Sequence, residues 1–167
     1  MKNYFELLSI EMRYDIDLQM LNTQYLAMQS KYHPDWAKTN EEKQSNLSIS
    51  IDINKAYSVL KCDLSRSKYL LFLHNIVLDE LILKQDISRE SLDYIWEELE
   101  LVEYTKELVD LEHILNDKIL KKNKLLESLI FAFQSNNMQN ALDITIKLQY
   151  IQNLLNKLQL KIKNLKI

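Results

Sequence analysis

The sequence predicts an all-α protein, and three observations lead to this fold class. The 167-residue chain contains no glycine and a single proline, Pro34, although average usage is about 7% glycine and 5% proline. Tight turns between β-strands need residues with positive φ, which glycine usually supplies. Leucine, isoleucine, lysine and glutamate are abundant instead, and apolar residues recur at steps of three and four, the period of a helix.

The first 75 residues predict four helices. A short opening helix carries Tyr4, Phe5, Leu7, Leu8 and Ile10. Asp17 is a suitable N-cap for the second helix, whose apolar positions are Leu18, Leu21, Tyr25, Met28 and Tyr32. The third starts at a capping box, with Thr39 as N-cap and Glu42 reaching back to it, and its inner positions are Ile49, Ile53, Ala56 or Tyr57, and Leu60. Asp63 is the expected cap of a short fourth helix.

The second and third helices are separated by the run Lys31-Tyr32-His33-Pro34-Asp35. Proline fixes φ, has no N–H to donate and keeps the preceding residue out of helical space. A helix that arrives through Tyr32 should therefore stop here. Because the flanking helices have similar lengths, we expect an antiparallel hairpin with His33-Pro34-Asp35 as a stiff, exposed corner at its tip.

The remainder, residues 76–167, predicts three helices in a second domain. The first follows Ser88, a break is expected near Tyr104–Lys106, and a turn is expected at Ser135-Asn136-Asn137 with Asn136 as N-cap. The last helix has an unbroken heptad seam formed by Ile144, Leu148, Ile151, Leu155, Leu158, Ile162 and Leu165. Such a seam requires a partner helix, and we expect the partner to come from the same chain, so that the protein is a monomer. Weak homodimerisation through the seam is the alternative.

Charge is distributed in blocks along the chain. Residues 1–75 carry nine basic and nine acidic side chains, residues 76–117 carry three and thirteen, and residues 118–167 carry nine and two. Blocks of opposite sign on successive helices should face one another in an antiparallel bundle. The basic block contains no arginine and no aromatic clustering, so we do not expect a nucleic-acid partner.

Catalysis is not expected from these residues. The three histidines are far apart, and without glycine there is no phosphate-binding loop. Cys62 is the only cysteine, which excludes Cys-rich zinc sites, and we expect it to be a buried, unreactive thiol. A carboxylate-bridged metalloenzyme would need Glu-x-x-His motifs on facing helices, and none occurs. We therefore expect a binding protein with no cofactor, no resident metal and no membrane segment, located in the cytoplasm.

The corner resembles the His-Pro-Asp signature of a J domain, the module that activates DnaK-type ATPase chaperones. Two further segments, Ile53-Asn54-Lys55-Ala56-Tyr57 and Asp63 to Leu71, resemble the end of the J domain in HscB-type co-chaperones of iron–sulfur cluster assembly, in the bacterial form. The acidic segment Trp96 to Leu101 and the C-terminal three-helix bundle resemble the same family. The resemblance implies an L-shaped, two-domain protein with a J domain at 1–75 and a scaffold-binding bundle at 76–167.

The resemblance also implies which residues bind partners. Those facing a DnaK- or HscA-type chaperone would be Lys31, Tyr32, His33, Pro34 and Asp35. Those facing an IscU-type iron–sulfur scaffold would be Ile95, Trp96, Leu99, Glu100, Glu103 and Tyr150. Compared with most J domains, the helix before the corner has few basic residues, with only Lys31, and Trp36 replaces the lysine that often follows the aspartate.

The implied function is a non-enzymatic co-chaperone that delivers the scaffold to its chaperone and stimulates that chaperone's ATPase. Two alternatives stay open. One is a J-domain protein with a different client. The other, from a different class, is a helical-bundle adaptor that binds a partner through its heptad seam while the corner has no role.

Overall fold

The computed structural model describes residues 3–76 and 89–166, excluding the side chains of residues 89–96. Every regular element in these ranges is a helix, which confirms the predicted fold class. Contacts divide the chain into two compact units, Met1–Leu70 and Leu71–Ile167. The division falls within α4 (Asp63–Leu73), near the boundary predicted after residue 75. The predicted cap Ser88 lies outside the described residues.

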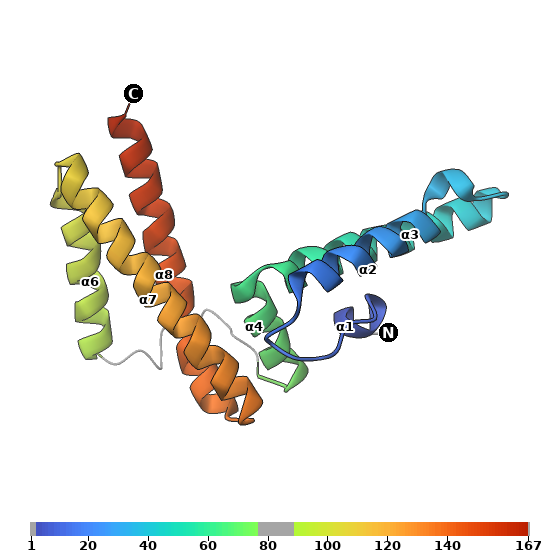
Figure 1. Cartoon of the computed structure of the whole chain (residues 1–167), viewed down its shortest axis with the longest axis horizontal. Coiled ribbons are helices and arrows are strands. Elements are labelled where there is room, and N and C mark those ends of the chain that lie inside the picture. Colours follow the sequence, from blue (N-terminus) through green and yellow to red (C-terminus); the bar gives the residue numbers. More distant parts are fainter. Residues whose placement is uncertain (1–2, 77–88, 167) are drawn as a thin grey trace. The chain divides into compact units, whose positions relative to one another are not determined.

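The first unit contains a helical hairpin. It begins with α1 (Tyr4–Leu7) and continues with α2 (Leu18–Lys31), the 3-10 helix η1 (Pro34–Trp36) and α3 (Asn40–Lys61). Helices α2 and α3 lie side by side and η1 lies at the far end of both (Figure 1). The predicted hairpin with a corner at its tip is therefore confirmed.

Four of the predicted apolar positions of this hairpin are buried, and Tyr25, Met28, Tyr32 and Ile49 are partly buried. Leu21 of α2 and Ile53, Ala56 and Leu60 of α3 are almost inaccessible to solvent, whereas Leu18 is 48% exposed. Leu18 is the first residue of α2, where the helix starts and fewer neighbours can cover it. The prediction for Leu18 was wrong because periodicity does not show where packing stops.

Helix α1 is shorter than predicted. Asn3 caps it by accepting a hydrogen bond from the Glu6 N–H at 2.9 Å, and Ser9 has a φ of 53°. This left-handed conformation ends the helix, so Ile10 is buried from an irregular segment. Tyr69 of α4 fixes the start of the chain, because its hydroxyl accepts the Tyr4 N–H at 2.9 Å and the two rings stack.

A buried arginine joins the end of α3 to α4. Arg66 is 4% exposed and its guanidinium donates to the carbonyls of Tyr14 at 2.7 Å and Leu60 at 2.5 Å. It also binds the Asp63 carboxylate at 2.6 Å. Asp63 is the first residue of α4 rather than the predicted cap before it, and its carboxylate serves this ion pair. Burial is the main reason why the pKa of Tyr14 is raised.

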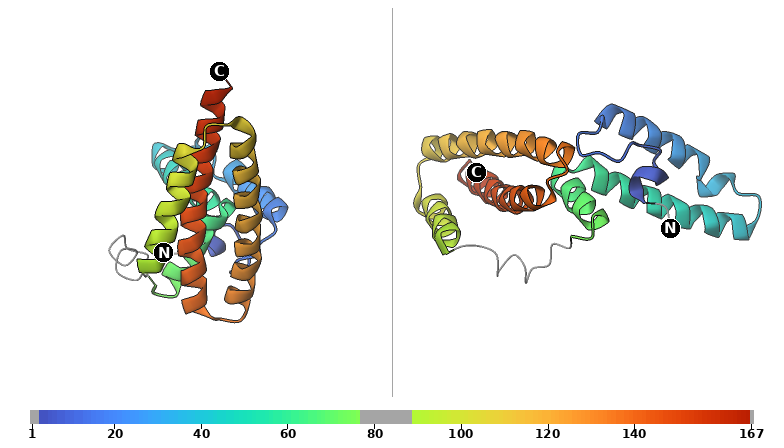
Figure 2. Two further views of the ribbon diagram at one scale, coloured as in Figure 1. Left: turned by 90° about the vertical axis from the view of Figure 1, so that its left-hand side faces the viewer. Right: turned by 90° about the horizontal axis from the view of Figure 1, so that it is seen from below.

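The second unit contains α6 (Arg89–Tyr104), α7 (Leu108–Gln134) and α8 (Met138–Leu165), drawn from two further directions in Figure 2. The break predicted near Tyr104–Lys106 and the turn predicted at Ser135–Asn137 are both confirmed. The cap of α8 is Asn137, which accepts from the Asn140 N–H at 3.1 Å. The prediction of Asn136 was wrong by one residue, since Asn136 makes the turn itself with a φ of 53°.

The heptad seam of α8 finds its partner within the chain. Six of its seven positions are buried, and Leu165 near the end of the helix is 49% exposed. Val102 of α6 and Leu111 of α7 form one cluster with Leu154, Leu158 and Ile162 of α8. The opposite charge blocks also face one another, as in the Lys166–Glu112 ion pair at 2.8 Å between α8 and α7.

Candidate functional sites

The His-Pro-Asp corner is built by the end of one helix and the start of a short one. The C-cap of α2 is Tyr32, whose N–H donates to the Met28 carbonyl at 3.1 Å. His33 has extended backbone angles, φ −67° and ψ 130°, as expected for a residue before proline. Pro34 is the first residue of η1, where a missing N–H costs nothing.

Within the corner, His33 and Asp35 are joined directly. The Asp35 N–H donates to His33 Nδ1 at 3.3 Å, and Oδ2 of Asp35 lies 3.5 Å from the same nitrogen. Because Nδ1 accepts a hydrogen bond, the neutral ring carries its proton on Nε2. The side chains are 51% and 79% exposed. The loop therefore offers a fixed N–H donor and a carboxylate acceptor to the solvent.

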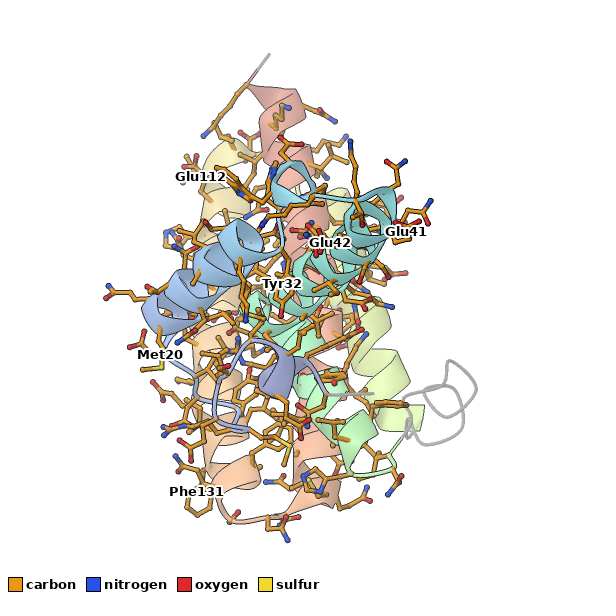
Figure 3. All side chains as sticks on the ribbon, turned by 90° about the vertical axis from the view of Figure 1, so that its right-hand side faces the viewer. Met20, Tyr32, Glu41, Glu42, Glu112 and Phe131 are labelled. Carbon is orange, nitrogen blue, oxygen red and sulfur yellow. The ribbon has the colours of Figure 1, made fainter. Side chains whose placement is uncertain are left out.

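The start of α3 holds the other side of the corner. Thr39 accepts from the Glu42 N–H at 3.1 Å, which confirms it as the N-cap. The Glu42 carboxylate accepts from the Lys38 N–H at 2.8 Å, so it reaches one residue further back than the capping box predicts. Figure 3 labels Tyr32 at the end of α2 and Glu41 and Glu42 at the start of α3. The loop is thus anchored at both ends.

The remaining predicted residue of this site, Lys31, lies beside the loop. Lys31 is the last residue of α2, and its Nζ lies 5.2 Å from the centre of the Tyr32 ring. The Lys31 ammonium is therefore held near the corner by a cation–π contact. Trp36, the last residue of η1, is 73% exposed.

Polar side chains on one side of the hairpin fix how α2 and α3 align, and the sequence did not predict them as a group. Tyr25 stacks on Tyr57 with ring centres 4.0 Å apart. Asn54 accepts from Tyr25 and Gln29, each at 2.9 Å. In the sequence, the only indication of this group was the segment Ile53 to Tyr57, which resembles the end of the J domain. This contact fixes where the corner projects.

The second predicted site lies on α6 and α8. Leu99 of α6 and Tyr150 of α8 are both partly buried and pack against the same apolar cluster. Glu100 and Glu103 are exposed on α6. The side chains of Ile95 and Trp96 lie outside the described residues.

Glu98 is buried, unlike its exposed neighbours Glu97 and Glu100 on the same helix. It is 9% exposed and pairs with the nearly buried Lys118 of α7, with Nζ–Oε1 at 2.8 Å. The glutamates of α6 are therefore of two kinds: Glu100 and Glu103 are exposed, whereas Glu98 is buried in an ion pair. The sequence signal for this pair is weak, because the two residues are twenty positions apart.

Cys62 is exposed, which contradicts the prediction of a buried thiol. Partial burial acts to raise its pKa, but hydrogen bonds from Ser65 and the Leu64 backbone outweigh it, and the pKa lies below its usual value. None of the described helices is long and apolar enough to cross a lipid bilayer. Across the described residues, no three His, Cys, Asp or Glu side chains are grouped as a metal ion would require.

Comparisons with known proteins match both units. Residues 90–159 match a family model described as the HSCB C-terminal oligomerisation domain. The co-chaperone protein HscB of Proteus mirabilis is 38% identical over 113 residues, which is 66% of this chain and 61% of that protein. The co-chaperone protein HscB homolog of Acinetobacter baumannii is 32% identical over 158 residues, covering 92% of this chain and 87% of that protein.

The human protein named iron-sulfur cluster co-chaperone protein HscB is 27% identical over 162 residues, 96% of this chain and 68% of that protein. The crystal structure of the human co-chaperone protein HscB matches with a TM-score of 0.90 at 27% identity. That alignment covers 96% of this chain and 82% of the human one, so the similarity includes both the hairpin and the bundle.

Proposed function

Because the chain belongs to the HscB family of co-chaperones, we propose that it acts in the cytoplasm as a co-chaperone of iron–sulfur cluster assembly. In this proposal it binds an IscU-type scaffold through its second unit and delivers it to a DnaK- or HscA-type chaperone. It stimulates the ATPase of that chaperone through His33, Pro34 and Asp35. The single observation that carries the proposal is the exposed, self-supported His-Pro-Asp corner at the tip of the hairpin.

The corner suits a role as a trigger read by another protein. The Asp35 carboxylate is available for a charge-assisted hydrogen bond to a basic group, and such bonds are about twice as strong as neutral ones. Pro34 and the hydrogen bond from the Asp35 N–H to His33 fix the backbone that carries this carboxylate before binding. Ordering costs at docking are correspondingly lower. The chain hydrolyses nothing itself in this mechanism, and the bound chaperone performs the reaction.

The scaffold would bind the surface formed by Leu99 and Tyr150 with Glu100 and Glu103 at its edge. Partly buried apolar groups beside exposed charges have the composition of an interface centre and its rim. Ile95 and Trp96 belong to the same proposed surface on the basis of the sequence alone. Carrying the two partner sites on separate units would let one co-chaperone hold the scaffold while its corner acts on the chaperone.

The test is single-turnover ATP hydrolysis by the chaperone, with and without this chain. We expect the wild-type chain to raise the rate and His33→Gln to abolish the increase, with the circular dichroism spectrum unchanged. His113→Gln is the matched control, because it makes the same change at an exposed histidine of the second unit. Unchanged stimulation by His33→Gln would instead favour a helical-bundle adaptor in which the corner has no role.

A pull-down with the full chain tests the client. The proposal expects the iron–sulfur scaffold and the chaperone to be retained together. A J-domain protein with a different client would retain the chaperone and another protein. A wild-type chain that stimulates the ATPase but never retains the scaffold would therefore refute the scaffold part alone.

A further inference from the structure

Helix α6 is held on the bundle partly by polar contacts with α7 and α8. Lys161 of α8 donates from Nζ to the Val102 carbonyl at 2.7 Å and the Glu103 carbonyl at 2.5 Å. These carbonyls belong to the last turn of α6, where a helix has no internal partners for them. A cation at this end is also favourable for the helix dipole. Lys161 therefore acts as a C-terminal cap supplied by another helix.

A second contact lies one to two turns earlier on α6. Glu98 is 9% and Lys118 4% exposed, and Lys118 Nζ lies 2.8 Å from Oε1 and 2.6 Å from Oε2 of Glu98. Lys121 adds a longer contact to Glu98 at 3.6 Å, and Asp117 lies 3.1 Å from Lys118. The centre of this small network is the Glu98–Lys118 pair, which joins α6 to α7.

Such a pair contributes specificity rather than stability. Removing two charges from water offsets most of their attraction, but leaving one of them buried without its partner is strongly unfavourable. A slip of α6 by one turn along α7 would move Glu98 by about 5.4 Å. That displacement would break the pair and leave both charges buried. The pair therefore favours one alignment of α6, and the Lys161 cap favours the same one.

We propose that Glu98, Lys118 and Lys161 are positioning residues for scaffold binding. They fix α6 so that Leu99 packs on the same apolar cluster as Tyr150 while Glu100 and Glu103 remain exposed. Glu98 is too buried to contact a scaffold itself, so it acts through these neighbours. This inference rests on the proposed function, because it assumes that the scaffold binds the Leu99–Tyr150 surface.

The decisive variant removes both charges together. In Glu98→Met with Lys118→Met, the buried pair becomes two flexible apolar side chains of similar length, a replacement that is often neutral or stabilising for folding. We expect the melting temperature to be retained and the scaffold affinity, measured by calorimetry, to fall about tenfold, the size of a typical interface contribution. If the pair served folding alone, scaffold affinity would fall only in variants whose melting temperature also falls. Retained stability with unchanged affinity would therefore overturn the inference.

Two controls accompany this double variant. Lys118→Arg keeps the charge pair and should keep scaffold affinity, so a comparable loss in this variant would contradict the inference. Lys157→Met makes the same lysine-to-methionine change at an exposed position of α8 and should leave affinity unchanged. If it weakened binding equally, loss of positive charge on the bundle would explain the result, and the inference would fail.

Lys161 provides an independent test if the double variant does not fold. Lys161 is partly exposed, so Lys161→Met would leave the end carbonyls of α6 to water, and the bundle should fold. We expect Lys161→Met to lower scaffold affinity several-fold and Lys161→Arg to restore it. Equal affinity of wild type and Lys161→Met would overturn the inference while leaving the proposed function intact. A wild-type chain that binds no scaffold would refute the proposed function, and the inference with it.

Discussion

His33 Nδ1 accepts the backbone N–H of Asp35 at 3.3 Å and lies 3.5 Å from the carboxylate of the same residue. The His33 side chain is thus held by the Asp35 backbone without help from the core of the hairpin, and both side chains are largely exposed. Residues that contribute little to the core can be changed with little effect on folding. We therefore expect variants of the corner to lose stimulation of the chaperone's ATPase while they keep their fold.

Asp35→Asn tests the charge of the corner. The amide keeps the size of the side chain but removes the negative charge, and a hydrogen bond to a charged group contributes about 1.5–3 kcal/mol. We expect the concentration of chain needed for half-maximal ATPase stimulation to rise by about tenfold or more, with unchanged thermal unfolding. Glu41→Gln, at an exposed acid of α3, is the control. Full activity of Asp35→Asn would remove the carboxylate from the mechanism.

Binding to the chaperone should depend only weakly on salt. From Leu18 to Lys43 the chain carries three basic and three acidic side chains, so the hairpin has little net charge to steer a charged partner. We expect the half-maximal concentration to change less than about threefold between about 50 mM and about 300 mM potassium chloride. Trp36→Lys, which adds a charge at an exposed position, should increase this dependence. A steep dependence in the wild type would show that other charges guide association.

Leu99→Ala combined with Tyr150→Ala tests the scaffold surface. Truncating central apolar and aromatic interface residues typically costs more than about 1 kcal/mol each, so we expect scaffold affinity to fall by about tenfold or more. Stimulation of the chaperone in the absence of scaffold should persist. Leu120→Ala is the matched control, since Leu120 is 62% exposed on α7, outside the proposed surface. Calorimetry showing the same affinity for the double variant and wild type would mean that the surface is wrongly placed.

Arg66→Met should destabilise the first unit. Removing the guanidinium leaves the carbonyls of Tyr14 and Leu60 without their donor. A buried acceptor left without a donor costs about 1–3 kcal/mol, whereas the Asp63 carboxylate, 39% exposed, can be solvated. We expect urea unfolding, followed by amide exchange in α3 and α4, to show this loss in the first unit. Lys55→Met, at an exposed position of α3, should have little effect, and equal stability of the two variants would show that the Arg66 contacts contribute nothing.

Local sequence patterns predicted the features that depend on nearby residues. Pro34 determines the corner, Thr39 determines the start of α3, and the period of three and four identified the seam of α8. The ion pair of Glu98 could not be predicted in this way, because it depends on Lys118, which only the fold brings near. The same limit explains Leu18, whose exposure depends on which neighbours reach the start of α2.

The prediction of the N-cap of α8 failed for a different reason. Asn136 and Asn137 are chemically identical, and either can cap a helix or adopt positive φ. The path of the chain between α7 and α8 determines that Asn136 adopts positive φ in the turn and that Asn137 is the N-cap of α8. Of the candidate sites, the corner was predictable because its residues are consecutive. The choice of Leu99 and Tyr150 came from a family resemblance, and only the fold shows that both pack on one apolar cluster.

The most direct test of the account is the steady-state ATPase rate of the chaperone with the scaffold and this chain added separately and together. The account predicts that the two together raise the rate above the sum of their separate effects, because the second unit delivers the scaffold while the corner triggers hydrolysis. A rate with both present that equals the rate of the chaperone alone would contradict it.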